Sequence, residues 1–213
     1  MASQTTHVIL SELVYGTHFS HLDERDFIVG TLFPDIRYLK VIERSATHIE
    51  GVSLADVKEE PNAFLAGMKF HNLVDQIREE FMVSRNMYEF CPEFKYVTQS
   101  VKLLEDERYY AMLGDWPHII SYLDGLIEEE AGYGIPAMSL EKWHGLLREY
   151  FMHPPTDHSR ERFLCGLDFP TETARSMNAY VDGRRNDARV VRIIDEFIRA
   201  FPELLTRAVS HYE

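Results

Sequence analysis

Apolar residues recur at helical spacing along most of the chain. The clearest stripe lies near the C-terminal end and follows the i, i+3, i+4, i+7 pattern, with Val190, Val191, Ile194, Phe197, Ile198 and Phe201. Such a stripe is typical of an amphipathic helix that buries one face. The alternating pattern that indicates strands is nearly absent. The sequence therefore predicts an all-α fold, a single-domain multi-helix bundle packed around one core.

Cap residues and helix breakers set the expected ends of the first elements. Thr5 or Thr6 can cap a first helix, and a second, short helix is expected from about residue 24 to 30. Pro34 interrupts the apolar segment that follows. Because proline disfavours a helical conformation at the residue before it, Phe33 is expected to be extended.

The remaining helices are expected after a long loop. Residues 40–60 have the composition of a loop with a short turn at 53–57, and Pro61 suits the first turn of a long helix that reaches about Val83. Pro202 is expected to begin the last helix. The further helices are expected at about 93–105, 107–113, 117–130, 139–151, 159–166, 170–181, 186–200 and 202–212.

Length, charge and cysteine usage narrow the class of protein. The 213 residues suffice for one domain, taken as 1–213. The 22 basic and 35 acidic residues give a net charge of −13, which repels nucleic acid, so no nucleic-acid partner is expected. No apolar run approaches the ~20 residues that span a bilayer, so no transmembrane segment is expected. The first residues lack a secretory signal, and two cysteines without a CxxC motif indicate a reducing, cytoplasmic location.

Two residues of the long predicted helix have the spacing of metal ligands. His71 and Asp75 stand four residues apart and therefore share one face, which is the edge of the apolar arc. Burying an ionised carboxylate there costs several kcal/mol unless it is paired or bound to a cation. The spacing suits two ligands of one metal ion. The alternative is a hydrogen-bonded His–Asp pair that only stabilises the core.

Three residues nearer the N-terminus are candidates for the same site. His7 lies in the first helix beside apolar residues, and Asp35 follows Pro34 in an otherwise apolar segment. A carboxylate embedded there is either a ligand or the N-cap of a helix that begins at Ile36. His48 lies in the predicted loop, where it is either a ligand or merely exposed.

Four short segments follow one another in a distinctive order. They are Thr-His-Val-Ile-Leu at 6–10, Gly-Thr-Leu-Phe-Pro-Asp-Ile at 30–36, Thr-His-Ile-Glu at 47–50 and Gly-Met-Lys-Phe-His-Asn-Leu-Val-Asp at 67–75. The second and fourth have the forms GxxxPD and GxxxHxxxD. Over residues 5 to 80 the chain thus resembles the zinc-dependent phospholipase C family of bacteria, and the resemblance implies an all-α fold of that type with a zinc cluster.

Carried over residue by residue, the resemblance implies a ligand set. It places Asp35, His48, His71 and Asp75 around one metal ion and lets His7 reach a second ion that Asp75 bridges. The chain departs from the family in lacking its N-terminal tryptophan ligand, a histidine soon after HxxxD and a later HxxxE. One or two ions are therefore expected rather than three.

A second arrangement points to related chemistry. His71, Asp75 and Glu79 form a row at four-residue spacing, and Phe201-Pro202 lies in the expected C-terminal helical region. This arrangement more loosely resembles the acyl carrier protein phosphodiesterases, which are small helical bacterial proteins. Both resemblances imply metal-assisted hydrolysis of a phosphoester and differ in the substrate.

The candidate ligands suggest how a phosphoester would be cleaved. A mixed set of His and Asp suits Zn²⁺, with Mn²⁺ or Fe²⁺ as alternatives. The ion lowers the pKa of a bound water towards ~7, and that water attacks phosphorus. Asp35 and Asp75 are the expected bridging or general-base carboxylates. Arg37 and Arg78 are expected to clamp phosphate oxygens, with a surface ion pair as the alternative for Arg37.

One candidate lies further along the chain. His118 comes three residues after Asp115 at an expected helix start. Either Asp115 only caps that helix, or His118 completes the site as general acid for the leaving group.

The sequence leaves more than one function open. The leading hypothesis is a phospholipase C-like, metal-dependent hydrolase that acts on a small phosphoester or a phospholipid. The alternatives are a hydrolase like the acyl carrier protein phosphodiesterases, or a helical interaction protein that keeps a metal ion without turnover. An HD-type phosphohydrolase is disfavoured because the chain contains no His-Asp dipeptide. The oligomeric state is not determined by the sequence.

Overall fold

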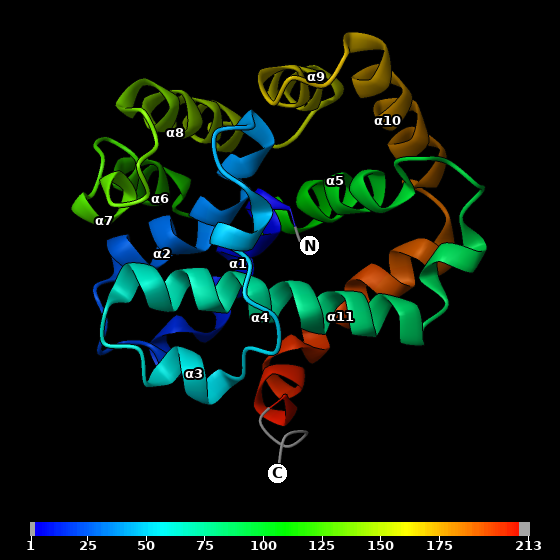
Figure 1. The fold of residues 1–213 in the computed structure, drawn as a ribbon. Coiled ribbons are helices and arrows are strands. Elements are labelled where there is room, and N and C mark those ends of the chain that lie inside the picture. Colours follow the sequence, from blue (N-terminus) through cyan, green and yellow to red (C-terminus); the bar gives the residue numbers. More distant parts are fainter. Residues whose placement is uncertain (1–2, 209–213) are drawn as a thin grey trace.

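The computed structural model describes residues 3–208, which form eleven α-helices and four 3-10 helices and contain no strand (Figure 1). The all-α prediction is therefore confirmed. The α-helices are α1 (Gln4–His18), α2 (Glu24–Leu32), α3 (Leu54–Lys58), α4 (Ala63–Ser84), α5 (Val97–Tyr109), α6 (Trp116–Tyr122), α7 (Glu128–Ala131), α8 (Ala137–Phe151), α9 (Asp157–Gly166), α10 (Thr171–Arg184) and α11 (Ala188–Arg207). The 3-10 helices are η1 (Phe33–Leu39), η2 (Arg44–Ala46), η3 (Met87–Phe90) and η4 (Tyr110–Met112).

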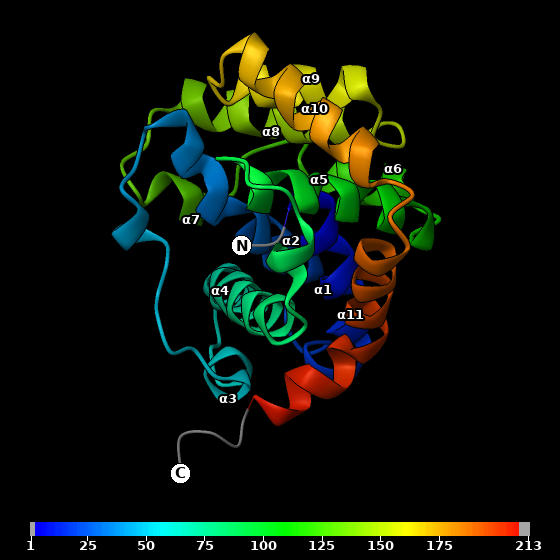
Figure 2. The same ribbon diagram turned by 90° about the vertical axis from the view of Figure 1, so that its right-hand side faces the viewer.

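The long helix α4 organises the lower half of the molecule. Helices α1, α2 and α11 pack against it. Figure 2, in which α4 is seen nearly along its axis, shows these helices to one side of it and α3 beneath it. Helices α8, α9 and α10 form an upper layer, and α5 lies between the two layers in contact with α1 and α10. One cluster of buried apolar side chains runs from α1 to α11.

Two glycines let α2 and α4 approach closely. A Cβ atom on Gly30 would lie 2.1 Å from the carbonyl oxygen of Phe64, and one on Gly67 would lie 2.1 Å from that of Phe27. Neither oxygen can move aside, because both belong to helix backbone. The glycines that open the GxxxPD and GxxxHxxxD segments are thus contact points between these two helices.

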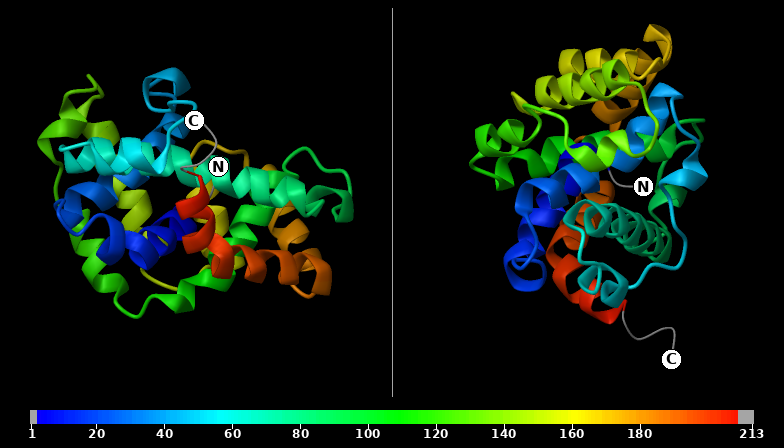
Figure 3. Two further views of the ribbon diagram at one scale, coloured as in Figure 1. Left: turned by 90° about the horizontal axis from the view of Figure 1, so that it is seen from below. Right: turned by 60° about the vertical axis from the view of Figure 1, so that its left-hand side comes forward.

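The segment predicted as a loop at 40–60 lies against the long helix. Figures 1 and 3 show it passing over the outside of α4 on its way from η1 to α3. The side-chain amide of Asn72 donates to the Thr47 carbonyl at 3.2 Å and holds the segment there. The turn expected at 53–57 is the short helix α3, which Ser53 caps by accepting from the backbone N–H of Asp56.

Several predicted helix starts are corrected by the structure. Helix α1 begins before Thr5, and the Thr6 hydroxyl and N–H both donate to Asp106 at 2.9 Å instead of capping the helix. Phe33 is helical, with φ −62° and ψ −40°, because α2 continues directly into η1. Pro34 then occupies the first turn of η1, where its missing N–H costs no hydrogen bond.

The long helix α4 also starts later than predicted. Pro61 precedes the helix, and Asn62 caps it by accepting from the Leu65 N–H at 3.0 Å. This arrangement places proline before the cap, where it interrupts no helical hydrogen bond.

The later boundaries differ in three places. The helices expected at 93–105 and 107–113 are instead one helix, α5, which ends at Tyr109 and is followed by the 3-10 helix η4. The helix expected at 117–130 is divided into α6 and α7 by a turn. The helices expected at 186–200 and 202–212 are one helix, α11, with Pro202 inside it, and residues 209–212 of that prediction lie outside the described part. Phe201 and Leu205 on either side of this proline are fully buried, so packing holds the helix together despite the lost hydrogen bond.

No helix within residues 3–208 is both long enough and apolar enough to cross a bilayer.

Candidate metal centre

Five side chains predicted as ligands meet in the interior. They come from α1, η1, the segment after η2, and α4, and each residue is at most 8% exposed. Two overlapping sets, His7–His71–Asp75 and Asp35–His48–His71, each bring one donor atom per residue within 4.8 Å of the others. The structure therefore brings together all five: His7, Asp35, His48, His71 and Asp75.

His71 is oriented by the helix beside it. Its Nδ1–H donates to the carbonyl oxygen of Thr31 at 2.9 Å, which directs Nε2 towards the other candidate ligands. The close approach of α2 to α4 makes this hydrogen bond possible. A donor to a backbone carbonyl is the usual support of a metal-binding imidazole.

The distances around Asp75 match a coordination sphere better than a hydrogen-bonded pair. Nε2 of His71 lies 3.5 Å from Oδ2 and Nε2 of His7 lies 3.5 Å from Oδ1, and neither nitrogen has a hydrogen-bond partner. The two imidazole rings stack with centroids 4.0 Å apart. Bonds of about 2.0–2.1 Å at a tetrahedral angle place two zinc ligands about 3.3–3.4 Å apart.

His48 and Asp35 complete the group from the other side. Nδ1 of His48 lies 3.1 Å from the Thr47 hydroxyl, and its buried Nε2 has no hydrogen-bond partner. Gln4 donates to Oδ2 of Asp35 at 2.6 Å. Asp35 lies inside η1 and caps nothing, so the N-cap alternative is wrong. His48 is only 7% exposed, so the alternative of a merely exposed histidine is wrong as well.

Electrostatics keeps two of the imidazoles in the form that binds metal. Burial and the neighbouring His71 lower the pKa of His7 and of His48 to about 4. Burial also opposes charge on His71, but Asp75 outweighs it and raises the pKa of that imidazole. Burial would raise the pKa of Asp75, yet His71 and His7 hold it well below its usual range. The carboxylate is therefore ionised, as a ligand must be.

The two arginines predicted as phosphate clamps have different surroundings. The guanidinium of Arg37 lies 3.5 Å from Asp35 Oδ1 and stacks over the Tyr38 ring at 4.3 Å, so it stands beside the centre. Arg78 is fully buried and points elsewhere, where its Nε and Nη2 donate to Glu105 at 2.8 and 2.5 Å. The phosphate-clamp prediction for Arg78 is wrong, because both of these donors serve a buried carboxylate.

His118 is not brought to the centre. It is exposed on α6, and its Nε2 bonds to the Tyr122 hydroxyl at 2.6 Å. Asp115 caps α6 by accepting from the His118 N–H at 3.2 Å, so the capping alternative describes this segment. The general-acid prediction for His118 has no support in this geometry.

Two openings reach the candidate ligands. A polar hollow of about 270 Å³ is lined by His48, Asp75 and Glu79 together with Arg44. A narrow cleft of about 50 Å³ reaches Asp35 from the side of α5 and α9. The centre is therefore buried but not sealed from ligands.

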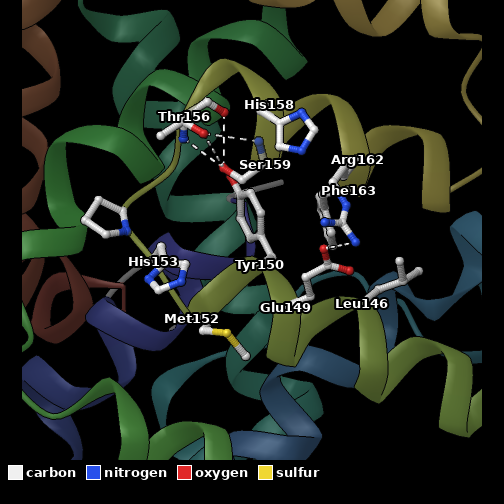
Figure 4. A pocket seen from close by; sticks show the side chains of 11 residues that line it. Leu146, Glu149, Tyr150, Met152, His153, Thr156, His158, Ser159, Arg162 and Phe163 are labelled. Atoms are coloured by element: carbon white, nitrogen blue, oxygen red, sulfur yellow. Dashed lines mark hydrogen bonds and ion pairs between the residues drawn. The ribbon is translucent and has the colours of Figure 1, made fainter.

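A further cavity lies away from these residues. It measures about 460 Å³ and sits at the turn between α8 and α9, with Tyr150 and Phe163 in its wall (Figure 4). Glu149 and Arg162 form an ion pair there. None of the five candidate ligands lines it.

Sequence reasoning missed the residues that support the ligands. Gln4 and the Thr31 carbonyl act through the packing of α1 and α2, which no local pattern reveals. The motifs include the glycines at 30 and 67, but their spacing does not predict which helix packs against them.

Comparison with protein-family models, with curated proteins and with solved structures found no match. The two family resemblances therefore stay predictions.

Proposed function

We propose that the protein is a metal-dependent phosphoester hydrolase whose centre holds one divalent ion among the five candidate ligands. Zn²⁺ is the first choice for a mixed His and Asp set, with Mn²⁺ or Fe²⁺ as alternatives. His71 belongs to both ligand sets. Because one imidazole nitrogen holds one ion, the shared residue favours a single ion over two independent sites.

The observation that carries the proposal is the state of the buried imidazole nitrogens. Nε2 of His7, His48 and His71 is buried without a hydrogen bond. A buried polar atom without a partner costs about 1–3 kcal/mol, so three such atoms in two overlapping candidate ligand sets need a common explanation. A cation supplies it, and the 3.5 Å separations from Asp75 suit ligands of one ion.

The chain's own residues fit a phosphoester at this centre. A divalent ion held there would supply a hydroxide nucleophile near neutral pH and offset charge on the phosphate. Arg37 stands beside Asp35 and can donate to a phosphate oxygen. Asp35 and Asp75 orient or deprotonate the attacking water. The 270 Å³ hollow at His48 and Asp75 gives a small ester a route to the centre.

The proposal concerns the bond that is cleaved rather than the organic group attached to it. A small phosphoester, a phospholipid and a phosphopantetheine-linked protein share this bond. The two family resemblances, to the zinc-dependent phospholipases C and to the acyl carrier protein phosphodiesterases, agree on it.

The test compares wild type with His71→Ala and with His118→Ala as the matched control. Wild type and the control are expected to carry about one zinc per chain by elemental analysis and to hydrolyse bis-p-nitrophenyl phosphate. His71→Ala is expected to lose the metal and at least ~100-fold in turnover. Zinc bound in a His71-dependent way, but without metal-dependent hydrolysis of any phosphoester, would instead support a helical interaction protein with a structural ion.

A further inference from the structure

One buried cation next to the centre is neither a candidate ligand nor one of the arginines predicted to clamp phosphate. Lys102 lies on α5 and is 5% exposed. Within residues 3–208 its ammonium forms no hydrogen bond or ion pair. A lysine is almost never buried in this way unless something holds its charge.

Charged groups from three elements act on Lys102. Asp35 from η1 lines the same cleft as Lys102, and the charges of Asp75 and Arg78 from α4 and of Glu105 from its own helix act electrostatically on its ammonium. Arg78 and Glu105 satisfy each other at 2.5 Å, so their charges cancel locally. The negative charges that remain near Lys102 are therefore those of Asp35 and Asp75, the carboxylates of the candidate metal centre.

A divalent ion changes this balance. With Asp35 and Asp75 engaged as ligands of an ion, Lys102 keeps its positive charge in a buried place without a counter-charge. The ion adds two positive charges to the same region. An anion bound beside the centre restores the balance, and the ammonium is placed to contact it.

The cleft in front of Lys102 has room for such an anion. Gln4, Asp35 and Lys102 form its polar side, and the remaining wall is mostly apolar, with Leu103 and Phe169. The residues that line the cleft come mainly from α1, η1, α5 and α9. Figure 1 shows α5 beside the N-terminal end of α1. Its volume of about 50 Å³ exceeds the ~15 Å³ that one water requires and suits a compact tetrahedral group.

We propose that Lys102 forms the phosphoryl-binding subsite of the centre, donating from the α5 side to a phosphate oxygen that the metal ion also attracts. The inference rests on the proposed function and adds a substrate-binding residue to it. Arg37 approaches the same centre from η1, so the two cations would hold different oxygens of one phosphoryl group. The ligand class is a phosphate ester or inorganic phosphate.

The test measures inorganic phosphate binding to the zinc-loaded protein by calorimetry. Lys102→Met removes the charge and keeps the length of the side chain, and Lys142→Met is the control, an exposed lysine 3.9 Å from Asp168. Lys102→Met is expected to keep its zinc and to bind phosphate about tenfold or more weakly. Its KM for bis-p-nitrophenyl phosphate is expected to rise by a similar factor, while Lys142→Met behaves as wild type.

The outcomes separate this inference from the proposed function. Unchanged phosphate affinity in folded, zinc-loaded Lys102→Met would overturn the subsite and leave the hydrolase proposal standing. A wild type that takes up none of Zn²⁺, Mn²⁺ and Fe²⁺ would overturn the hydrolase proposal. Phosphate titrated onto that metal-free protein would then support the anion site if Lys102→Met weakens binding, and would overturn it if Lys102→Met binds equally well. If Lys102→Met does not fold, NMR of wild type with ¹³C-labelled lysine replaces it. Added phosphate is expected to shift the Cε resonance of Lys102. An unshifted resonance would overturn the subsite.

Discussion

The two ring nitrogens of His71 have different surroundings, and this difference shows how a single residue shapes the centre. Nδ1 is tied to the Thr31 carbonyl, and Nε2 faces Asp75 without a hydrogen bond. Arg78, about two turns along the same helix, is equally buried but donates to Glu105 through Nε and Nη2. Burial alone therefore does not distinguish a candidate ligand from a structural side chain. The distinction depends on whether the polar atoms of the side chain already have hydrogen-bond partners.

Arg78 gives a prediction at this scale. Arg78→Met is expected to lower the free energy of unfolding by about 3–5 kcal/mol, because it leaves the Glu105 carboxylate buried without its partner. Urea denaturation measures the loss, and Arg78→Met/Glu105→Leu is expected to recover much of it. The zinc content of the folded variant should equal that of wild type. A stable Arg78→Met that binds zinc and loses turnover would restore Arg78 to the site.

At the scale of elements, the contact between α2 and α4 orients His71 in the centre. Gly30 and Gly67 let the two backbones touch, and this contact brings the Thr31 carbonyl to His71. The motif glycines therefore act on the ligands indirectly, by setting the distance between two helices. A bundle with ordinary helix spacing would leave Nδ1 of His71 without its acceptor.

A pair of glycine variants tests this contact. Gly67→Ala places a Cβ atom 2.1 Å from a backbone oxygen and is expected to destabilise the protein by about 3 kcal/mol or more and to reduce zinc affinity. Gly145→Ala, in the exposed middle of α8 with nothing within 4 Å, is expected to stabilise it by about 0.5–1 kcal/mol. Thermal unfolding and zinc titration measure both. Equal behaviour of the two variants would contradict the role of the close approach.

For the molecule as a whole, the centre joins parts of the chain that are far apart in sequence. His7 comes from α1 and Asp75 from α4, and Asp106 on α5 accepts from both Thr6 on α1 and Tyr150 on α8. The centre is therefore fixed by the packing of both layers of the bundle. An ion that binds only the folded arrangement must stabilise all of it.

Metal removal tests this coupling. With zinc at about 100 times its dissociation constant, the ion contributes about 2.7 kcal/mol, so a chelator is expected to lower the melting temperature of wild type by about 5–10 °C. His71→Ala should melt at one temperature with or without chelator. Calorimetry or circular dichroism measures the shift, and an identical melting temperature of wild type in both conditions would show that no ion stabilises the fold.

The sequence by itself determined the all-α architecture and the residue types of the candidate ligands, because both are local. Helical periodicity depends on residues three or four apart, and His71 and Asp75 share a face for the same reason. The residues at positions 7, 35 and 48 could also be selected from the sequence, because they are polar groups in apolar or loop surroundings and match known motifs.

Only the tertiary structure decided which polar residues belong to the centre. Arg78 is removed from it by Glu105, which lies 27 residues further along the chain, and His118 is held elsewhere by Tyr122. Lys102 joins it because α5 packs against α1, and Pro202 stays inside α11 because its neighbours are buried. These outcomes depend on contacts between distant segments, whose free energies exceed the local preferences that a sequence pattern reveals.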